Sequence, residues 1–335
     1  MAAMRRYVIT VLALLSASAL GLLGFGYHFH ALTTPASLAR LQARDGEDVV
    51  LPADLRYNAA FKIARVEEVQ PDVLCISSSR AGTLRDWMFK PYRFYNASFT
   101  AWTTAQLLDV FEHLTRKVRP RVVIVALDYF LFTDSWDDGY KTQRAMIYQP
   151  SRYVSFKLTH LLHALPAPVA FQEDRRQDGF RRDGSYLYPP SFIEMARSKL
   201  QTAQHMLEAA PGAPQMSERQ MAPIVQLASL AKQRGIKLIA VQLPYVRGAV
   251  DYLDTNEAYR PYSGVWRDFE SEQRAGWLRS LGIVFFDLAH SPIADDPMNF
   301  IDAYHPSEQG MVKLLKQLLN EKEFQDQLPD LNATG

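Results

Sequence analysis

Apolar runs alternate with amphipathic segments through most of the chain, from about residue 57 onward. The runs are short, continuous and bounded by turn residues or polar clusters, which is typical of buried strands. They are residues 72–77, 121–127, 237–243 and 283–287. The segments with apolar side chains at helical spacing are residues 103–118, 222–234 and 307–322. Buried strands separated by helices predict an α/β fold, with helices on both faces of a parallel sheet.

Residues 133–215 interrupt this alternation and are rich in Tyr, Arg, Asp and Pro. We interpret them as an insertion within a domain spanning residues 57–325. Such an insertion either shapes a substrate cleft at the carboxyl ends of the strands or forms a solvated cap, and both interpretations stay open. Residues 31–56 are predicted as a tether and residues 326–335 as a C-terminal tail.

The first 30 residues contain an uncharged, apolar stretch over residues 7–29, preceded by Arg5 and Arg6. About 20 apolar residues span a bilayer, whereas the core of a signal peptide has about 7–15. We therefore expect an inner-membrane signal anchor with a cytoplasmic stub. The arginine pair places the globular domain on the periplasmic side. A cleaved signal is the alternative, because residues 16–19 are small.

Composition narrows the function class. The 335 residues include 37 Lys plus Arg and 36 Asp plus Glu, a net charge of +1, so no basic excess indicates a nucleic-acid partner. The single cysteine, Cys75, excludes an intramolecular disulfide and any multi-cysteine metal site. It falls within a predicted strand and is expected to be buried. No cofactor and no metal are predicted.

Candidate chemistry begins at Ser77-Ser78-Ser79-Arg80, where the first strand of the domain ends. A serine at a strand-to-helix turn can expose its hydroxyl above the sheet edge, beside backbone N–H groups that stabilise an oxyanion. The same serines could instead cap the helix. Ser78 is the alternative nucleophile if the strand ends one residue earlier.

A second candidate is the pair formed by Asp302 and His305, three residues apart. A carboxylate at this spacing can hold an imidazole in one tautomer, as in a catalytic triad. The pattern is weakly specific, because Asp287 and His290 repeat it. The later copy is favoured, since it directly precedes the last predicted helix, which Pro306 marks.

Together, these features resemble the SGNH hydrolase family, also called the GDSL-type esterase and acyltransferase fold, a three-layer sandwich. The resemblance implies that Ser79 is the nucleophile, His305 the general base and Asp302 the residue that orients it. The Ser-Arg pair, the Asn-Ala-Ser segment at residues 96–98 and the His-Pro-Ser-x-x-Gly ending look most like one exported, membrane-anchored branch. That branch is similar to the proteins that O-acetylate alginate or D-alanylate teichoic acids.

The family's oxyanion positions carry departures from its pattern. Ser77 stands where the family has Gly, Ala101 where a Gly donates its N–H, and Asp128 where an Asn donates. Alanine keeps the donor if the backbone tolerates a Cβ. Asp128 would repel an oxyanion unless it is protonated, turned away or not catalytic, so Asn96 is a substitute donor. Arg80 is expected to bind a substrate carboxylate or phosphate, or to form a structural ion pair.

We expect an exported O-acyltransferase, with acetyl as the first candidate group, that modifies hydroxyls of a cell-surface or secreted polysaccharide through an acyl-serine. The resemblance implies a multi-pass membrane acyltransferase as the partner that delivers the acyl group. The alternatives are a polysaccharide esterase or deacetylase, and a non-catalytic carbohydrate-binding scaffold. Trp102, Trp136 and Trp266 could stack on sugar rings or pack in the core.

Overall fold

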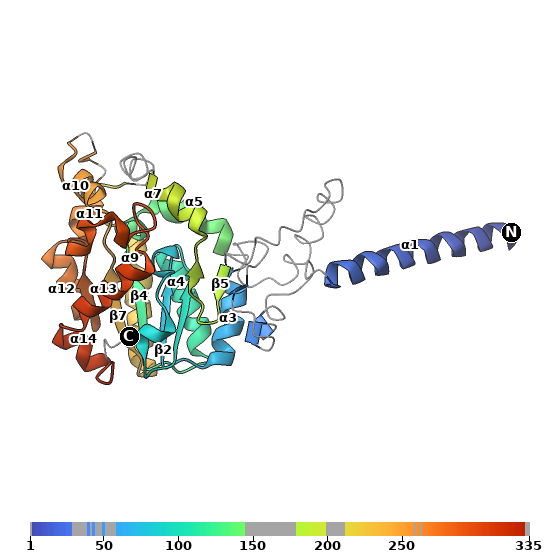
Figure 1. The fold of residues 1–335 in the computed structure, drawn as a ribbon, viewed down its shortest axis with the longest axis horizontal. Coiled ribbons are helices and arrows are strands. Elements are labelled where there is room, and N and C mark those ends of the chain that lie inside the picture. Colours follow the sequence, from blue (N-terminus) through green and yellow to red (C-terminus); the bar gives the residue numbers. More distant parts are fainter. Residues whose placement is uncertain are drawn as a thin grey trace.

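The computed structural model describes residues 2–28, 39–40, 42–43, 49–50, 58–144, 179–198, 212–257, 259–261 and 263–331. At the centre of this part lies a five-stranded parallel sheet with the order β3-β2-β4-β7-β8 (Figure 1). The strands are β2 (Val73–Ser77), β3 (Phe94–Ser98), β4 (Val122–Ala126), β7 (Lys237–Gln242) and β8 (Ile283–Asp287).

Burial explains why four of these strands were visible as continuous apolar runs. Every residue of β2 and β4 is buried, so neither strand shows the alternation of a half-exposed strand. Strand β3 was not predicted, although all five of its residues are buried too. Its polar residues Asn96 and Ser98 interrupt the apolar pattern.

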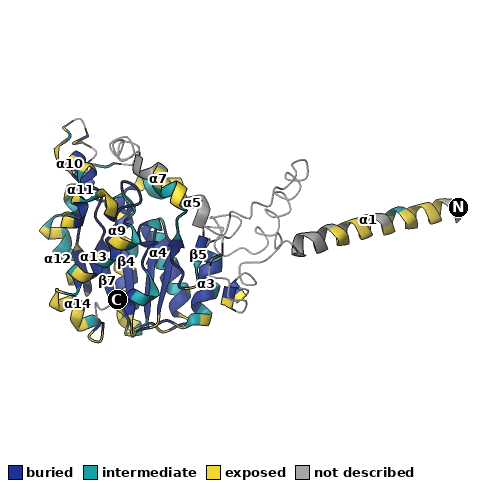
Figure 2. Cartoon of the chain, in the orientation of Figure 1, coloured by how far each residue is buried: buried dark blue, intermediate teal, exposed yellow. Residues whose placement is uncertain are grey.

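Helices flank the sheet on both faces, which confirms the predicted α/β architecture. Right-handed connections place α4 (Thr104–Thr115) and α9 (Glu218–Arg234), which pack on each other, on one face. Helix α13 (Glu308–Leu318) covers the other face. There its apolar side chains meet those of β4 and β7: Met311, Leu314, Leu315, Leu318, Ile124, Ala126 and Val241. Figure 2 shows the strands buried and the outer sides of the helices exposed.

The remaining helices pack around this centre. They are α3 (Asn58–Val69), α10 (Arg247–Thr255), α11 (Gly264–Phe269), α12 (Glu272–Ser280) and α14 (Lys322–Gln327). Helix α12 packs against the edge strand β8, and α3 packs against β3. Cys75 is fully buried in β2, and burial raises the pKa of its thiol to about 12, which agrees with its predicted role as a small buried hydrophobe.

The predicted insertion lies between β4 and β7. Its described parts are α5 (Asp134–Arg144), β5 (Gly179–Arg181), β6 (Tyr186–Leu187) and α7 (Pro190–Ser198). Strands β5 and β6 form an antiparallel hairpin, and β1 (Val49–Val50) pairs with β5 to make a small three-stranded sheet. Residues 145–178 and 199–211 of the insertion lie outside the described residues.

The segment predicted as a tether packs on the domain where it is described. Besides the pairing of β1 with β5, Ala39 and Gln42 are fully buried. The Gln42 side-chain amide donates to the carbonyl of Phe180 at 2.9 Å. The chain therefore joins the domain before residue 57, at the hairpin of the insertion.

Helix α1 (Ala2–His28) contains the apolar N-terminal stretch, and most of its described side chains are exposed. Across the portions of the chain that are described, no helix combines the length and the apolar character needed to cross a membrane.

Candidate active site

Ser79 follows the carboxyl end of β2, which lies between β3 and β4 in the sheet, and it begins the short 3₁₀ turn η2 (Ser79–Ala81). The hydroxyl of Ser78 caps this turn by accepting a hydrogen bond from the N–H of Arg80 at 3.4 Å. Gly82 follows the turn at a place where the backbone is closely packed: a Cβ there would lie 2.8 Å from both the Phe99 ring and the carbonyl oxygen of Ser79. Ser79 is half-buried, whereas Ser77 and Ser78 are buried. The turn thus presents only the last serine of the three at the sheet edge.

Asp302 and His305 lie in a tight loop that precedes α13. One carboxylate oxygen of Asp302 accepts the backbone N–H groups of Tyr304 at 3.0 Å and of His305 at 2.9 Å. The loop closes on itself because the N–H of Ile301 donates to the carbonyl of His305 at 2.8 Å. Ser307 then caps α13, with its hydroxyl accepting from the N–H of Gly310 at 3.3 Å. These local bonds fix both side chains before any substrate is bound.

The structure brings Ser79, His305 and Asp302 into one hydrogen-bonded chain. Ser79 Oγ lies 2.8 Å from His305 Nε2, across 226 residues of sequence. His305 Nδ1 lies 2.7 Å from Asp302 Oδ2. Burial opposes ionisation of Asp302, but the charge and hydrogen bond of His305 and the two backbone N–H groups together lower its pKa. An ionised Asp302 selects the tautomer with the proton on Nδ1, which leaves Nε2 free to accept the proton of the Ser79 hydroxyl.

Asn96, proposed above as an oxyanion donor, is engaged elsewhere. Its side-chain nitrogen donates to the carbonyls of Ala81 at 2.8 Å and Leu84 at 2.9 Å, and its oxygen accepts from the N–H of Ser98 at 2.9 Å. The residue is fully buried. Its amide therefore holds the turn that follows Ser79, and the oxyanion role expected from the sequence is wrong for this side chain.

Ala101 lies beside the end of β2, in the turn after β3. Its N–H lies 3.4 Å from the carbonyl of Ser77, which also accepts from Thr100 at 3.3 Å. The positive φ of this turn, 64°, falls on Phe99 rather than on Ala101, so the Cβ of Ala101 meets no conformational penalty. The exchange of Gly for Ala is therefore tolerated. The long bond to Ser77 is the one a substrate oxygen would have to compete with.

Asp128 and Arg80 form a buried ion pair, so the structural alternative named for Arg80 is the one observed. The side chain of Arg80 is 3% exposed and that of Asp128 is fully buried. Asp128 faces the Arg80 guanidinium instead of the Ser79 hydroxyl. A substrate carboxylate or phosphate cannot reach a guanidinium enclosed in this way. The prediction that Arg80 or Asp128 contacts the substrate directly is therefore wrong.

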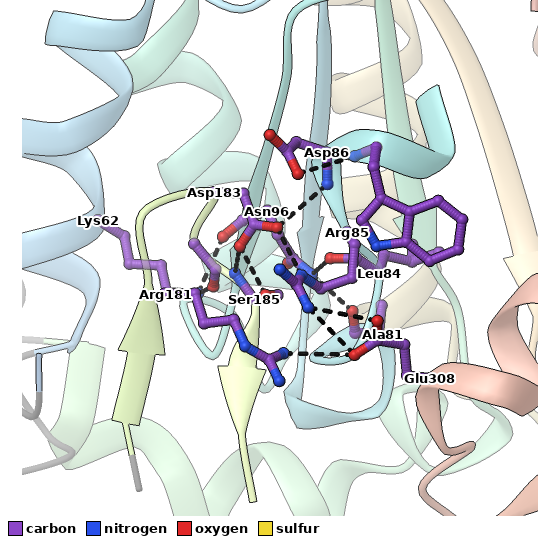
Figure 3. Close-up of polar contacts among 12 residues, drawn as sticks. Lys62, Ala81, Leu84, Arg85, Asp86, Asn96, Arg181, Asp183, Ser185 and Glu308 are labelled. Carbon is purple, nitrogen blue, oxygen red and sulfur yellow. Dashed lines mark hydrogen bonds and ion pairs between the residues drawn. The ribbon is translucent and has the colours of Figure 1, made fainter. Parts of the chain in front are cut away.

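Hydrogen bonds and ion pairs hold the hairpin β5–β6 against the segment that follows Ser79, as Figure 3 shows. Asp183, in the bend of the hairpin, accepts from Arg85 Nε at 2.7 Å and from Ser185 Oγ at 2.6 Å. Arg85 and Arg181 converge on the carboxylate of Glu308 at the start of α13, at 3.2 and 3.5 Å. The insertion is thereby tied both to the segment after Ser79 and to the helix that follows His305.

The buried amine of Lys62 lies next to this network (Figure 3). It donates to the carbonyl of Asn96 at 2.9 Å and to that of Gly184, and it lies 4.1 Å from the centre of the Phe180 ring. Burial lowers the pKa of Lys62 well below its ordinary value. These two bonds to backbone carbonyls connect α3 to the hairpin through Lys62.

The insertion supplies aromatic side chains next to the reacting group, which the sequence analysis did not identify. The ring centroid of Tyr188 lies 6.2 Å from that of His305, and Phe192 stacks on Tyr188 at 5.8 Å with an interplanar angle of 23°. Both are half-buried, as is Trp102, which belongs to the same aromatic cluster. The described part of the insertion thus places an aromatic ring beside His305.

The other tryptophans pack internally. Trp266 is fully buried, and its indole N–H donates to Asp254 at 2.9 Å. The indole N–H of Trp136 donates to the carbonyl of Trp102 at 2.6 Å. Neither indole N–H is free for a sugar, and Trp102 packs against the same buried cluster as Tyr188.

The earlier Asp-x-x-His pair is part of a different cluster. Asp287 accepts from the N–H of Ala289 at 2.9 Å, while His290 Nε2 lies 3.2 Å from Glu270. Ligand atoms of Asp254, Glu270 and His290 lie within 4.8 Å of one another, so these are the described residues that could hold a metal ion. They are not connected by hydrogen bonds to Ser79.

No family model and no curated protein matches the chain. Among solved structures, it is similar to a candidate acylhydrolase from Bacteroides fragilis NCTC 9343, with a TM-score of 0.39 and 15% identity over 88% of this chain and 98% of that one. It is also similar to a GDSL-like lipase from Bacteroides thetaiotaomicron VPI-5482, with a TM-score of 0.39 and 12% identity over 88% and 99% of the two chains. Similarity at this level does not carry an activity from those proteins to this chain.

Proposed function

We propose that this protein transfers acyl groups through an acyl-serine intermediate on Ser79. The observation that carries the proposal is the Ser79–His305–Asp302 chain, with 2.8 and 2.7 Å between its successive polar atoms. A strand-to-turn serine hydrogen-bonded to an imidazole that a carboxylate orients is the arrangement of an activated nucleophile.

The reaction has two half-steps. Ser79 Oγ attacks the carbonyl carbon of an acyl donor while His305 Nε2 takes the hydroxyl proton. The imidazolium, stabilised by Asp302, then returns that proton to the departing oxygen or sulfur, leaving the acyl group on Ser79. In the second half-step, His305 deprotonates an acceptor hydroxyl, whose oxygen attacks the acyl-serine. Collapse of the tetrahedral intermediate releases the new ester, and the proton returns to Ser79.

The acceptor we propose is a hydroxyl of a cell-surface or secreted polysaccharide. Support comes from the half-buried ring of Tyr188 beside His305, with the half-buried ring of Phe192 stacked on Tyr188. Such rings pack against the C–H faces of sugars while polar groups stay hydrated. The apolar stretch over residues 7–29 supports an exported protein held at the inner membrane, with its domain on the periplasmic side. The corresponding partner is a multi-pass membrane acyltransferase that supplies the acyl group.

An esterase that uses water as acceptor is the second candidate. It is favoured by the exposure of the His305 side chain, 17%, which leaves part of the imidazole accessible to water. Transfer and hydrolysis share the first half-step, and they differ only in whether a sugar hydroxyl outcompetes water for the acyl-serine.

Fluorophosphonate labelling of the purified full-length protein tests the nucleophile. We expect one adduct, on Ser79, with no adduct in Ser79→Ala. In Asp302→Asn, labelling should slow by about 10³–10⁴-fold, because the wrong tautomer is held. Ser78→Ala is the matched control and should keep the adduct. Absence of an adduct in the folded wild-type protein, or an adduct on Ser78, would refute the assignment.

Transfer is then separated from hydrolysis with p-nitrophenyl acetate as donor. Acetyl groups that appear on an added polysaccharide, and vanish in Ser79→Ala, support the transferase. Release of free acetate at the same rate with and without polysaccharide supports the esterase.

A further inference from the structure

The side chain next to the nucleophile is a buried arginine. Arg80 occupies the second position of η2, directly after Ser79, and its side chain is 3% exposed. Burying a guanidinium is costly unless every direction in which it donates is matched by an acceptor. All three nitrogens of the Arg80 guanidinium find acceptors, which come from three separate segments.

Each segment comes from the carboxyl-end edge of the sheet or from the loop that carries His305. Nε of Arg80 donates to the carbonyl of Tyr304 at 2.8 Å. One terminal nitrogen donates to the carbonyls of Leu243 at 2.9 Å and Pro244 at 2.6 Å, just after β7. The other terminal nitrogen binds the carboxylate of Asp128, just after β4.

The bond to Tyr304 matters most for the chemistry, because Tyr304 lies between Asp302 and His305. Arg80 therefore connects the backbone on one side of the Ser79–His305 bond to the backbone on its other side. The planar fork of arginine can satisfy these acceptors at once, whereas the single ammonium of lysine cannot. The ring of Tyr245, with its centre 3.9 Å from the guanidinium carbon, closes the remaining face.

Asp128 supplies the compensating charge. Its side chain is fully buried, so without Asp128 the positive charge of Arg80 would be unbalanced beside Asp302 and His305. The charges of both residues reach the site: Arg80 interacts electrostatically with Asp302, and Asp128 with His305. The pair is thus neutral as a unit but strongly charged if either member is removed.

We propose that Arg80 and Asp128 are a positioning pair, which fixes the His305 loop against the Ser79 turn and keeps the charge around the imidazole balanced. This inference rests on the proposed acyl-serine chemistry, since it assigns the pair a role in activating Ser79.

The pH dependence of labelling reports this balance. Several groups face His305: Asp302 and Tyr304 from its own loop, Tyr188 from the insertion, and Arg80 with Asp128 from the ends of β2 and β4. At the start of α13, Glu308 is engaged by Arg85 and Arg181. Among these, Asp128 is the buried anion that can be neutralised without touching the hydrogen bonds of the imidazole.

The test measures the rate of fluorophosphonate labelling of full-length protein as a function of pH. In Asp128→Asn, the pH of half-maximal labelling should fall, because a buried anion no longer stabilises the imidazolium. In Arg80→Met/Asp128→Leu, both charges are removed together, so the fold should persist. Labelling should nonetheless slow at least tenfold at every pH, because the Tyr304 carbonyl has lost its donor. Asp268→Asn breaks the ion pair with Arg274, a pair far along the chain, and is the control.

The outcomes separate the two proposals. A wild-type protein that does not label refutes the acyl-serine and the pair together. A labelled wild type with an unchanged profile in Asp128→Asn and an unchanged rate in the folded double variant overturns the positioning role alone. If the double variant does not fold, the shift of the Asp128→Asn profile decides, since a purely structural role would leave that profile in place.

Discussion

Replacing Asn96 separates two roles that the sequence could not distinguish. In Asn96→Ala the carbonyl of Leu84 loses its amide donor and the N–H of Ser98 loses its acceptor, both in a fully buried setting. The carbonyl of Ala81 also loses a donor, but it keeps the N–H of Leu84 at 3.2 Å. Two groups are therefore left without the partner that Asn96 supplied.

Each buried polar group left without a partner costs about 1–3 kcal/mol, so the free energy of unfolding should fall by about 3 kcal/mol. For a domain of about 270 residues, with an unfolding entropy of about 2.1 cal/mol/K per residue, that corresponds to a decrease in Tm of about 5 °C. Thermal unfolding of the purified protein, followed by circular dichroism, measures it. Ser98→Ala is the matched control: the Ser98 hydroxyl is buried and makes no hydrogen bond within the described residues, so its removal should leave Tm nearly unchanged.

The rate of fluorophosphonate labelling distinguishes the two roles of Asn96. At temperatures below the Tm of the variant, Asn96→Ala should label with a fluorophosphonate at a rate close to that of the wild type, reduced only by the loosening of the Ser79 turn. An oxyanion donor would behave in the opposite way, with a loss of about 10²–10³-fold in rate at unchanged Tm. Unchanged stability with that loss of rate would refute the assignment of Asn96 as the residue that holds the turn.

Two further predictions concern charge and backbone conformation. Burial and nearby carboxylates raise the pKa of Glu270 from 4.5 to about 9, so the folded state binds more protons than the unfolded state between these values, and stability falls as pH rises through this range. Glu270→Gln should therefore raise Tm at pH 8 and leave it unchanged at pH 4; a decrease at pH 8 would contradict the shift. Gly184 has φ +80°, and a Cβ there would collide with the carbonyl oxygen of Asn96, whereas Gly235, at φ +67°, has open space. Gly235→Ala should cost about 1–2 kcal/mol from its backbone conformation, and Gly184→Ala clearly more, with equal decreases in Tm arguing against the docked hairpin.

The strands of the sheet were predictable where their sequences are mostly apolar, as in β2, β4, β7 and β8. Residues 283–287 are the bounds of β8 as observed, and residues 121–127 differ from β4 by one residue at each end. Parallel strands covered on both faces form nearly continuous apolar runs, so most of them can be recognised from the sequence alone. Strand β3 was missed because it contains a polar residue, Asn96, whose side-chain amide is hydrogen-bonded to carbonyls of another segment. Nothing within the strand itself indicates that such a partner exists.

The same distinction applies to the site. Ser79, Asp302 and His305 each stand next to a local signal, the end of a strand or the start of a helix, and the structure brings the three together. Asp128 was recognised as a position of interest, but its partner Arg80 lies 48 residues away. Tyr188 reaches His305 only because the hairpin docks on the Ser79 turn. The Asp-Gly of the hairpin bend was the available signal, but it lacks flanking strand patterns.

The burial of Ala39 and Gln42 against the hairpin sets the reach of the domain. Only ten residues lie between His28, the end of α1, and Ala39, the first buried residue among those that the structure describes. Fully extended, they span at most about 40 Å. If α1 attaches to a surface, Ala39 would therefore lie within about 40 Å of the end of α1. A linker that ended at residue 57 would instead extend about 100 Å. With α1 attached in this way, the domain would meet only acceptors close to that surface, and the local concentration of any partner fixed there would be correspondingly high.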